Sequence, residues 1–244
     1  MDFLRIVSPI YGENCYVLVT ASKAALVVDP GAKTASRVSQ VLSELGAKLE
    51  AIVLTHGHAD HLWNTAKVAA LNPQAPIYLA TPDHFWVEAP GPATQLGVNS
   101  DFESVDGVWE PIKVVAPRAE LFGEGGAEII KGLTLRALPA PGHSPGCTMF
   151  FGLANQPDDH GQGLGFDGRE NQAFCFSGDV IFQGSIGRTD LPHSDPEVMQ
   201  ETLRTLRLSV NPDTLLLTGH GPSTTWKHEL ETNPFLPRTR KVTE

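Results

Sequence analysis

Length, composition and charge exclude several classes of protein before any motif is considered. The 244 residues suffice for one large domain, and a hydrophobic content of 41% can build a sizeable core. A formal charge of −10, with no run of lysine or arginine, disfavours a nucleic-acid partner. With no leader at Met1 and no stretch of about eighteen apolar residues, we expect a cytoplasmic protein without membrane contact. An odd number of cysteines argues against a disulfide framework.

Strands and helices alternate in the N-terminal part of the chain. Short apolar runs predict the strands, and apolar residues at helical spacing predict the helices. The expected strands span 15–19, 25–28, 51–54 and 76–79, and the expected helices span 34–45 and about 62–71. Thr34 can cap the start of the first helix and Gly46 its end. The order ββαβαβ indicates an α/β fold built in layers.

The rest of the chain contains further strands and two irregular segments. Prolines and glycines break residues 81–112, which separate two strand-rich halves. Residues 154–172 form a polar, glycine-rich insertion with too few apolar residues to bury anything, so we expect a mobile loop in which His160 is solvated. The expected strands are 133–138, a strand closed by 150–152, 173–176 and 214–217, and the expected helix is 194–208.

A cluster of metal-ligand residue types follows one of these strands. His56, His58, Asp60 and His61 lie on the turn between the strand 51–54 and the next helix. Functional sites of α/β folds usually lie at the carboxyl ends of strands. Imidazole and carboxylate together suit Zn²⁺, Fe²⁺ or Mn²⁺. On an irregular loop His56 and His58 can converge on one ion while Asp60 and His61 point to another.

Three other strands end in the same way. His143 lies on a tight loop between two Gly/Pro turns, Asp179 follows a strand and a glycine, and His220 follows the last clear strand. Each residue alone could be an ordinary turn residue, but together with the histidine loop they predict a metal site. Asp29 ends an earlier strand and is either a turn residue or a carboxylate that orients the histidine loop.

These motifs, in this order, resemble the metallo-β-lactamase-fold hydrolases over nearly the whole chain. The resemblance implies a single domain, 1–244, with a four-layer αββα sandwich. Within that superfamily the sequence looks most like short bacterial glyoxalase II-like (hydroxyacylglutathione hydrolase-like) proteins. The stretches that carry this closer match are Asn14-Cys15, Val28-Asp29-Pro30-Gly31, Gly187-Arg188-Thr189-Asp190, Gly219-His220-Gly221-Pro222 and Asn233-Pro234-Phe235-Leu236.

The resemblance implies a site for two divalent metal ions. Zinc is the expected metal, with iron or manganese as alternatives. One ion would be bound by His56, His58 and His143, and the other by Asp60, His61 and His220. Asp179 would bridge the two ions, and Asp60 and Asp179 are the catalytic candidates. Arg188 matches the position at which glyoxalase II-type proteins bind the carboxylate of glutathione, a task that suits the guanidinium fork.

The implied reaction is hydrolysis of a small acyl thioester similar to S-lactoylglutathione. Two ions roughly 3.5–4 Å apart can share a hydroxide with a pKa near 7, which attacks the carbonyl. The leaving thiolate needs little general-acid help, because free thiols ionise near pKa 8.5. Glyoxalase II proteins have a longer helical C-terminal region than the sequence that follows Phe235, so strict glutathione specificity stays open.

Other functions remain open at this point. A persulfide dioxygenase of the same fold would use a single iron bound by His56, His143 and Asp179. A lactonase would share the hydrolytic site. The alternative from a different class is a non-catalytic metal-binding protein, which is disfavoured because structural zinc sites fill all four positions with protein ligands. The sequence leaves the oligomeric state open.

Overall fold

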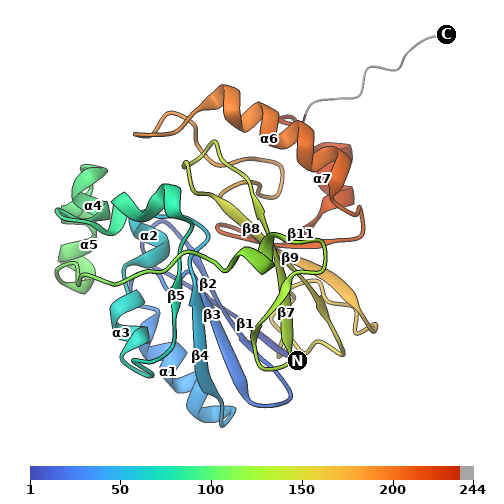
Figure 1. Ribbon diagram of the computed structural model, residues 1–244, viewed down its shortest axis with the longest axis horizontal. Helices are drawn as coiled ribbons and strands as arrows, with labels where there is room; N and C mark the ends of the chain where they lie inside the picture. Colours follow the sequence, from blue (N-terminus) through green and yellow to red (C-terminus); the bar gives the residue numbers. More distant parts are fainter. Residues whose placement is uncertain (237–244) are drawn as a thin grey trace.

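Two β-sheets face each other in the computed structural model, which describes residues 1–236 (Figure 1). The sheets have the strand orders β1-β2-β3-β4-β5 and β11-β10-β9-β8-β7-β6. The first contains β1 (Asp2–Val7), β2 (Asn14–Val19), β3 (Ala24–Val28), β4 (Lys48–Val53) and β5 (Ile77–Tyr78). The second contains β6 (Ala127–Ile130), β7 (Leu133–Pro139), β8 (Thr148–Ala154), β9 (Gln172–Gly178), β10 (Leu215–Thr218) and β11 (Thr224–Thr225). The two strand-rich halves of the sequence thus form one sheet each.

Helices cover the outer faces of both sheets, which confirms the predicted αββα layers (Figure 1). On the first sheet they are α1 (Ala35–Glu44), α2 (Ala59–Leu62) and α3 (Thr65–Ala69), and on the second α6 (Pro196–Ser209) and α7 (Trp226–Thr232). The region expected to be irregular contains η1 (Thr81–Val87), α4 (Pro92–Gln95), α5 (Asn99–Asp106) and η2 (Ala119–Phe122). None of the helices within residues 1–236 has the length and apolar character needed to cross a bilayer.

Alternating side chains of the inner strands of the first sheet fill two different cores. In β2, Tyr16 and Leu18 enter the core between the sheets, whereas Cys15 and Val17 pack toward the helices. Burial of both faces explains why this strand is a continuous apolar run in the sequence. A third core joins α6 to the second sheet. All three cysteines are buried and free, as expected for small core residues.

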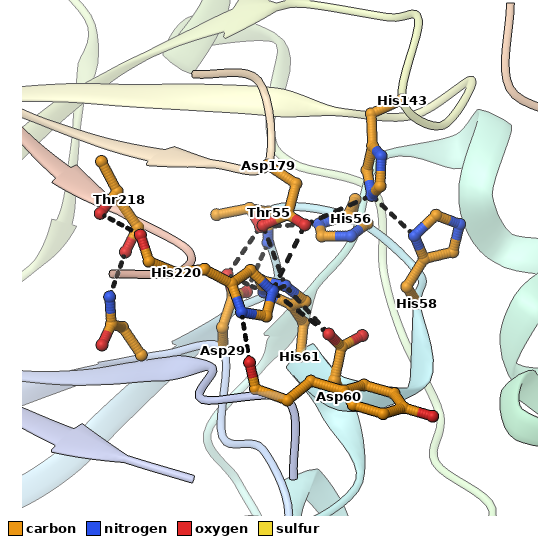
Figure 2. Close-up of polar contacts among 12 residues, drawn as sticks. Asp29, Thr55, His56, His58, Asp60, His61, His143, Asp179, Thr218 and His220 are labelled. Atoms are coloured by element: carbon orange, nitrogen blue, oxygen red, sulfur yellow. Dashed lines mark hydrogen bonds and ion pairs between the residues drawn. The ribbon is translucent and has the colours of Figure 1, made fainter. Parts of the chain in front are cut away.

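Parallel pairing gathers the strand ends that carry the polar motifs. Strand β3 is parallel to β4, and β9 is parallel to β10. The carboxyl ends of β3 and β4 therefore deliver Asp29 and the histidine loop to one edge, and those of β9 and β10 deliver Asp179 and His220. Because the two sheets are stacked, these edges meet and form one site (Figure 2).

The ends of two predicted helices differ from expectation. The helix expected from residue 62 begins at Ala59 and is divided into α2 and α3 near Asn64. Thr34 precedes α1 but does not cap it with its side chain, because its Oγ1 donates to the carbonyl of Gly31 at 2.6 Å. The Asn64 Oδ1 atom instead accepts from the Ala35 amide at 3.2 Å. Gly46, with φ +60°, ends α1 as predicted.

The insertion 154–172 packs against the first strand, so the expectation that it buries nothing is wrong. Leu164 is fully buried in the core between the sheets, and the ring of Phe166 lies 4.4 Å from that of Phe3. The Phe3 amide also donates to the Asp158 carbonyl at 2.8 Å. The apolar partners come from β1, which the composition of the insertion alone could not reveal. His160 is exposed as expected, and its mobile setting stays a prediction.

We predict that Leu164→Ala destabilises the protein by about 2–5 kcal/mol, because it removes a buried side chain that the surroundings replace incompletely. The same change should speed proteolytic cleavage within residues 155–171. Urea unfolding and limited proteolysis measure the two effects. The control is Leu153→Ala, whose side chain is 55% exposed and whose loss should change stability by less than about 0.5 kcal/mol. Equal effects of the two substitutions would contradict a role for Leu164 in holding the insertion.

Candidate metal centre

All of the side chains expected at the metal site lie together where the two sheets meet (Figure 2). They come from four separate segments, one after each of β4, β7, β9 and β10. In chain order they are His56, His58, Asp60, His61, His143, Asp179 and His220. Most of them are buried, so the site is a polar cluster within an apolar framework.

The cluster consists of two groups with a carboxylate between them. In the first group His58 Nδ1 lies 2.8 Å from His143 Nε2, and the His56 ring lies 4.8 Å from that of His58. In the second group His220 Nε2 lies 3.2 Å from Asp60 Oδ2 and 3.3 Å from His61 Nε2.

Asp179 contacts both groups. Its Oδ1 lies 3.1 Å from His61 Nε2, and its Oδ2 lies 3.5 Å from His143 Nε2 and 3.4 Å from His220 Nε2. Figure 2 shows His143 and His220 on opposite sides of this carboxylate. Asp179 is therefore placed to interact with a cation in either group.

The unpaired atoms of the cluster fit divalent cations. Within residues 1–236, His56 Nε2 is buried without a hydrogen-bond partner, and the equally buried Asp179 Oδ1 has only its ion-pair contact with His61. Buried polar atoms are rarely left without a partner. His58 Nδ1 and His143 Nε2 pair with each other, but the second nitrogen of His58, Nε2, is also buried without a partner in this part of the chain. Nitrogen and carboxylate donors in this combination suit Zn²⁺, Fe²⁺ or Mn²⁺.

Oxygen atoms of the backbone and of one side chain orient the histidine rings by accepting from the ring nitrogens that point away from the centre of the cluster. The Nδ1 atoms of His143 and His220 donate to the main-chain carbonyls of Arg188, at 2.7 Å, and Tyr11, at 3.1 Å. His61 Nδ1 donates to Asp29 Oδ2 at 3.0 Å. These bonds leave each Nε2 free to face the centre of the cluster, the arrangement found behind many metal-binding histidines.

Asp29 was expected to be either a turn residue or a carboxylate that orients the histidine loop. The structure shows the second role. Its Oδ1 accepts from the Thr55 amide at 2.7 Å, and its Oδ2 accepts from the Thr55 hydroxyl at 2.6 Å as well as from His61. The carboxylate thereby fixes both the start of the loop and one of its rings.

The sequence does not predict a second orienting carboxylate, Asp83 of η1. This buried side chain accepts from the Gly57 amide at 2.8 Å, the Ser144 hydroxyl at 2.6 Å and the Gly146 amide at 2.5 Å. It joins the histidine loop to the loop that carries His143. An aspartate in a proline-broken segment carries no signal for this role, because its partners are distant in sequence.

Burial and neighbouring charges shift the histidine pKa values of the two groups in opposite directions. Burial, reinforced by neighbouring imidazoles, lowers the pKa of His58 to about 3 and that of His56 well below 6.5. Burial acts in the same direction on His220, but Asp179 and Asp60 outweigh it and raise the pKa to about 10. Cations must therefore compete with protons mainly in the second group.

The acidic residues of the second group stay charged. Burial opposes ionisation of Asp60, but the nearby His61 and His220 rings lower its pKa to about 2. The same two histidines overcome burial at Asp179 and hold its pKa well below 3.8. A further buried acid, Glu13, lies nearby, but burial raises its pKa well above 4.5 and disfavours an additional negative charge.

Two motif glycines allow the backbone to approach Asp179. A Cβ atom at Gly219 would lie 2.2 Å from Asp179 Oδ1, and one at Gly187 would lie 1.9 Å from the Asp179 carbonyl oxygen. Neither position can hold a side chain without displacing the carboxylate or its strand end. The physical reason for both motifs is thus close packing around this residue.

A pocket of about 400 Å³ opens over the cluster. Arg188 lines it, and the guanidinium Nε and Nη2 atoms each donate to Asp190 at 2.9 Å. The arginine side chain is 67% exposed, so it can still reach a ligand at the pocket rim. The full lining is Tyr11, His58, Asp60, Leu96, Val98, His143, Asp179, Phe182, Ile186, Arg188, Leu191 and His220.

Comparison with known proteins agrees with this geometry. The hydroxyacylglutathione hydrolase GloC of Haemophilus influenzae is 32% identical over 228 residues, which cover 93% of each chain. The structure of the B3 metallo-β-lactamase BLEG-1 superposes with a TM-score of 0.71 at 30% identity and covers 96% of this chain and 99% of its own. TTHA1623, solved in a di-iron-bound form, gives 0.68 at 29% identity, with 95% and 99% covered. Residues 9–156 match the model of the metallo-β-lactamase superfamily. The chain belongs to the metallo-β-lactamase superfamily of metallo-hydrolases.

Proposed function

We propose that this protein is a metal-dependent hydrolase that cleaves a small acyl thioester of the S-lactoylglutathione type. The observation that carries the proposal is the position of Asp179 between two groups of ligand atoms at the base of an open pocket. The name of GloC, a hydroxyacylglutathione hydrolase, supports the choice of substrate class.

The two groups would each hold one divalent ion. His56, His58 and His143 form the first set of ligands, Asp60, His61 and His220 the second, and Asp179 is shared. Zinc is the first choice, and the di-iron form of TTHA1623 supports iron as an alternative, with manganese a third. When bound, such ions act as Lewis acids and lower the pKa of a coordinated water to about 7.

The pocket lining favours a leaving group that needs no proton. Apart from the proposed ligands, only Tyr11 and Arg188 of the lining carry acidic protons. Burial and the bond to Asp101 raise the pKa of Tyr11 to about 12, and a guanidinium remains protonated in proteins. Neither group is a good proton donor near neutral pH. A thiolate leaves readily without such a donor, whereas an amide nitrogen does not.

Arg188 would bind an anionic part of the thiol carrier. Its guanidinium lies at the rim of the pocket, and its carbonyl orients His143. Asp190 holds the side chain in place but also neutralises part of its charge. The arginine therefore suits modest recognition of an exposed carboxylate, with its exposure limiting the strength of the contact.

The first test combines metal content with thiol release. We expect two metal ions per chain by elemental analysis and metal-dependent release of glutathione from S-lactoylglutathione. His58→Ala and Asp179→Ala should each abolish turnover and reduce metal content while the circular dichroism spectrum remains that of a folded protein, because each removes a ligand.

Other outcomes would reject the proposal. One iron per chain, no thiol release and oxygen uptake with a persulfide would identify a dioxygenase. Cleavage of a lactone or a β-lactam without thiol release would identify a different hydrolase. Full activity in either ligand variant would reject the ligand assignment.

Asp29→Asn should weaken cation binding by about 10–100-fold, because the amide cannot accept from both His61 and Thr55 as the carboxylate does. Competition with a chelating dye measures the affinity. Asp195→Asn is a matched control, since Asp195 caps α6 and asparagine caps helices equally well. Unchanged affinity in Asp29→Asn would show that the carboxylate does not support the site.

Arg188→Ala should raise the KM of a glutathione thioester by about 3–10-fold and leave kcat nearly unchanged, because an exposed contact to the carrier is lost. The KM of a neutral N-acetylcysteamine thioester should not change. Arg204→Ala removes an exposed arginine of α6 that is paired with Glu201 and serves as the control. Equal effects on the anionic and neutral thioesters would exclude Arg188 from substrate recognition.

A further inference from the structure

The stretch Asn233-Pro234-Phe235-Leu236 lies directly after α7 and contributes nothing to the lining of the pocket. The backbone of Asn233, with φ −69° and ψ 119°, leaves the helical conformation, as expected for a residue before proline. Leu236 then enters the core that joins α6 to the second sheet and is 3% exposed. The proline thus ends α7 and the leucine anchors the chain that follows, but neither role requires an asparagine at 233.

The buried side chain of Asn233 contacts a tight turn formed by residues 182–185. In this turn the Phe182 amide donates to the Ser185 carbonyl at 2.9 Å. The Asn233 Nδ2 atom donates to the same Ser185 carbonyl at 3.0 Å and lies 3.4 Å from the Phe182 carbonyl oxygen. The Oδ1 atom accepts from the Phe235 amide at 3.0 Å. This assignment of the side-chain amide places its nitrogen on acceptors and its oxygen on a donor.

Glu229 of α7 holds the same turn. The residue is fully buried, and its two side-chain oxygens accept three hydrogen bonds. Oε2 accepts from the Gly184 amide and from Asn233 Nδ2, both at 2.8 Å, and Oε1 accepts from the Thr224 hydroxyl at 2.6 Å. The carboxyl group therefore joins α7 and β11 to the turn. We use "turn clamp" for the pair Asn233 and Glu229.

The chain on both sides of the turn borders the proposed metal centre. Asp179 shortly precedes the turn, and Arg188, whose carbonyl accepts from His143, shortly follows it. A Cβ atom at Gly187 would lie 1.9 Å from the Asp179 carbonyl oxygen and 2.9 Å from the His143 ring. The backbone that leaves the turn is thus packed against both residues, so a shift of the turn would displace them.

The turn also contacts the second group of proposed ligands through its first residue. The Phe182 ring meets the His220 ring edge-on, with the ring centres 5.7 Å apart. This edge-to-face arrangement is favourable for aromatic pairs. The position of the turn therefore affects the orientation of His220 as well as that of His143.

We propose that the turn clamp is a positioning device for the metal centre: by fixing the turn, it holds Asp179, His143 and His220 in the arrangement that binds divalent cations. The inference rests on the ligand set of the proposed function and not on the identity of the substrate. Neither clamp residue lines the pocket, so each acts through the turn. Loss of the clamp should leave all of the proposed ligands present but alter their geometry.

The hydrogen bonds predict opposite results for two substitutions at Glu229. In Glu229→Gln the amide oxygen can still accept from Gly184 and Asn233, while the amide nitrogen donates to Thr224, whose hydroxyl can also accept. Glu229→Met has a similar length, but its thioether is only a weak acceptor. Asn233→Leu similarly keeps the approximate shape of asparagine and removes its donor.

We expect the affinity for Zn²⁺ to fall by about 3–10-fold in Glu229→Met and in Asn233→Leu, less than is typical for a direct partner of a ligand, because both residues act through the turn. In Glu229→Gln it should change by less than about 2-fold. Competition with a chelating dye measures the affinity, and circular dichroism verifies that each variant is folded.

The visible absorption of the protein loaded with Co²⁺ reports the geometry of the ligands, because the bands of this ion depend on its coordination. We expect the spectrum to change in Glu229→Met and Asn233→Leu and to remain that of the wild type in Glu229→Gln. Leu206→Ala is the control for lost stability, since it removes a buried side chain of α6 from the same core as Leu236. It should keep the spectrum and the affinity of the wild type.

The outcomes separate this inference from the proposed function. Wild-type affinity and spectra in both Glu229→Met and Asn233→Leu would overturn the inference and leave the metal centre standing. A loss of the same size in Leu206→Ala would attribute the effect to stability, and an equal loss in Glu229→Gln would exclude the hydrogen bonds described, so either result overturns the inference. A wild-type protein that binds neither Zn²⁺ nor Co²⁺ would overturn the proposed function and the inference with it.

Discussion

The close packing of the chain around the Asp179 carboxylate is the constraint on which the rest of the site depends. Its two oxygens contact the rings of His61, His143 and His220, which follow β4, β7 and β10, so a shift of any of these rings affects it. Glycines at 187 and 219 are needed because side chains there would occupy the space of Asp179. The parallel pairing of β9 with β10 shifts in register between Leu217 and Thr218, and Thr218 pairs with Gly178, directly before Asp179. The backbone conformation around Asp179 and the placement of the proposed ligands therefore depend on each other.

Much of this arrangement could be predicted because its signals are local. Histidines and aspartates directly after apolar runs mark strand ends, and parallel strands bring such ends to a common edge. The layers also follow from local patterns, since strands buried on both faces, like β2, require helices outside the sheets. The candidate ligands His56 and His58 could be located in this way even though His143 is far away in the sequence.

The parts that could not be predicted depend on contacts between distant segments. Asp83 joins two loops through three hydrogen bonds, and Asn64 caps a helix to which it does not belong. Leu164 is buried only because β1 supplies partners for it. In each case the residue type has ordinary local uses, such as turns or loops, and the tertiary contact overrides them. A single sequence contains no spacing from which such partners can be read.

The strand ends carry the proposed metal site, whereas the loops form much of the pocket lining. This separation explains how one fold can act on different substrates. The proposed ligand residues are held by strand ends and by buried carboxylates such as Asp29, whereas part of the pocket lining comes from the segments around Leu96 and Phe182, outside the two sheets. Changes in those segments alter the shape and polarity of the pocket without disturbing the ligands. Relatives about 30% identical to this chain accordingly include proteins named as a hydroxyacylglutathione hydrolase and as a B3 metallo-β-lactamase. Substrate choice must therefore be argued from the pocket lining of each protein, because a shared fold does not specify the substrate.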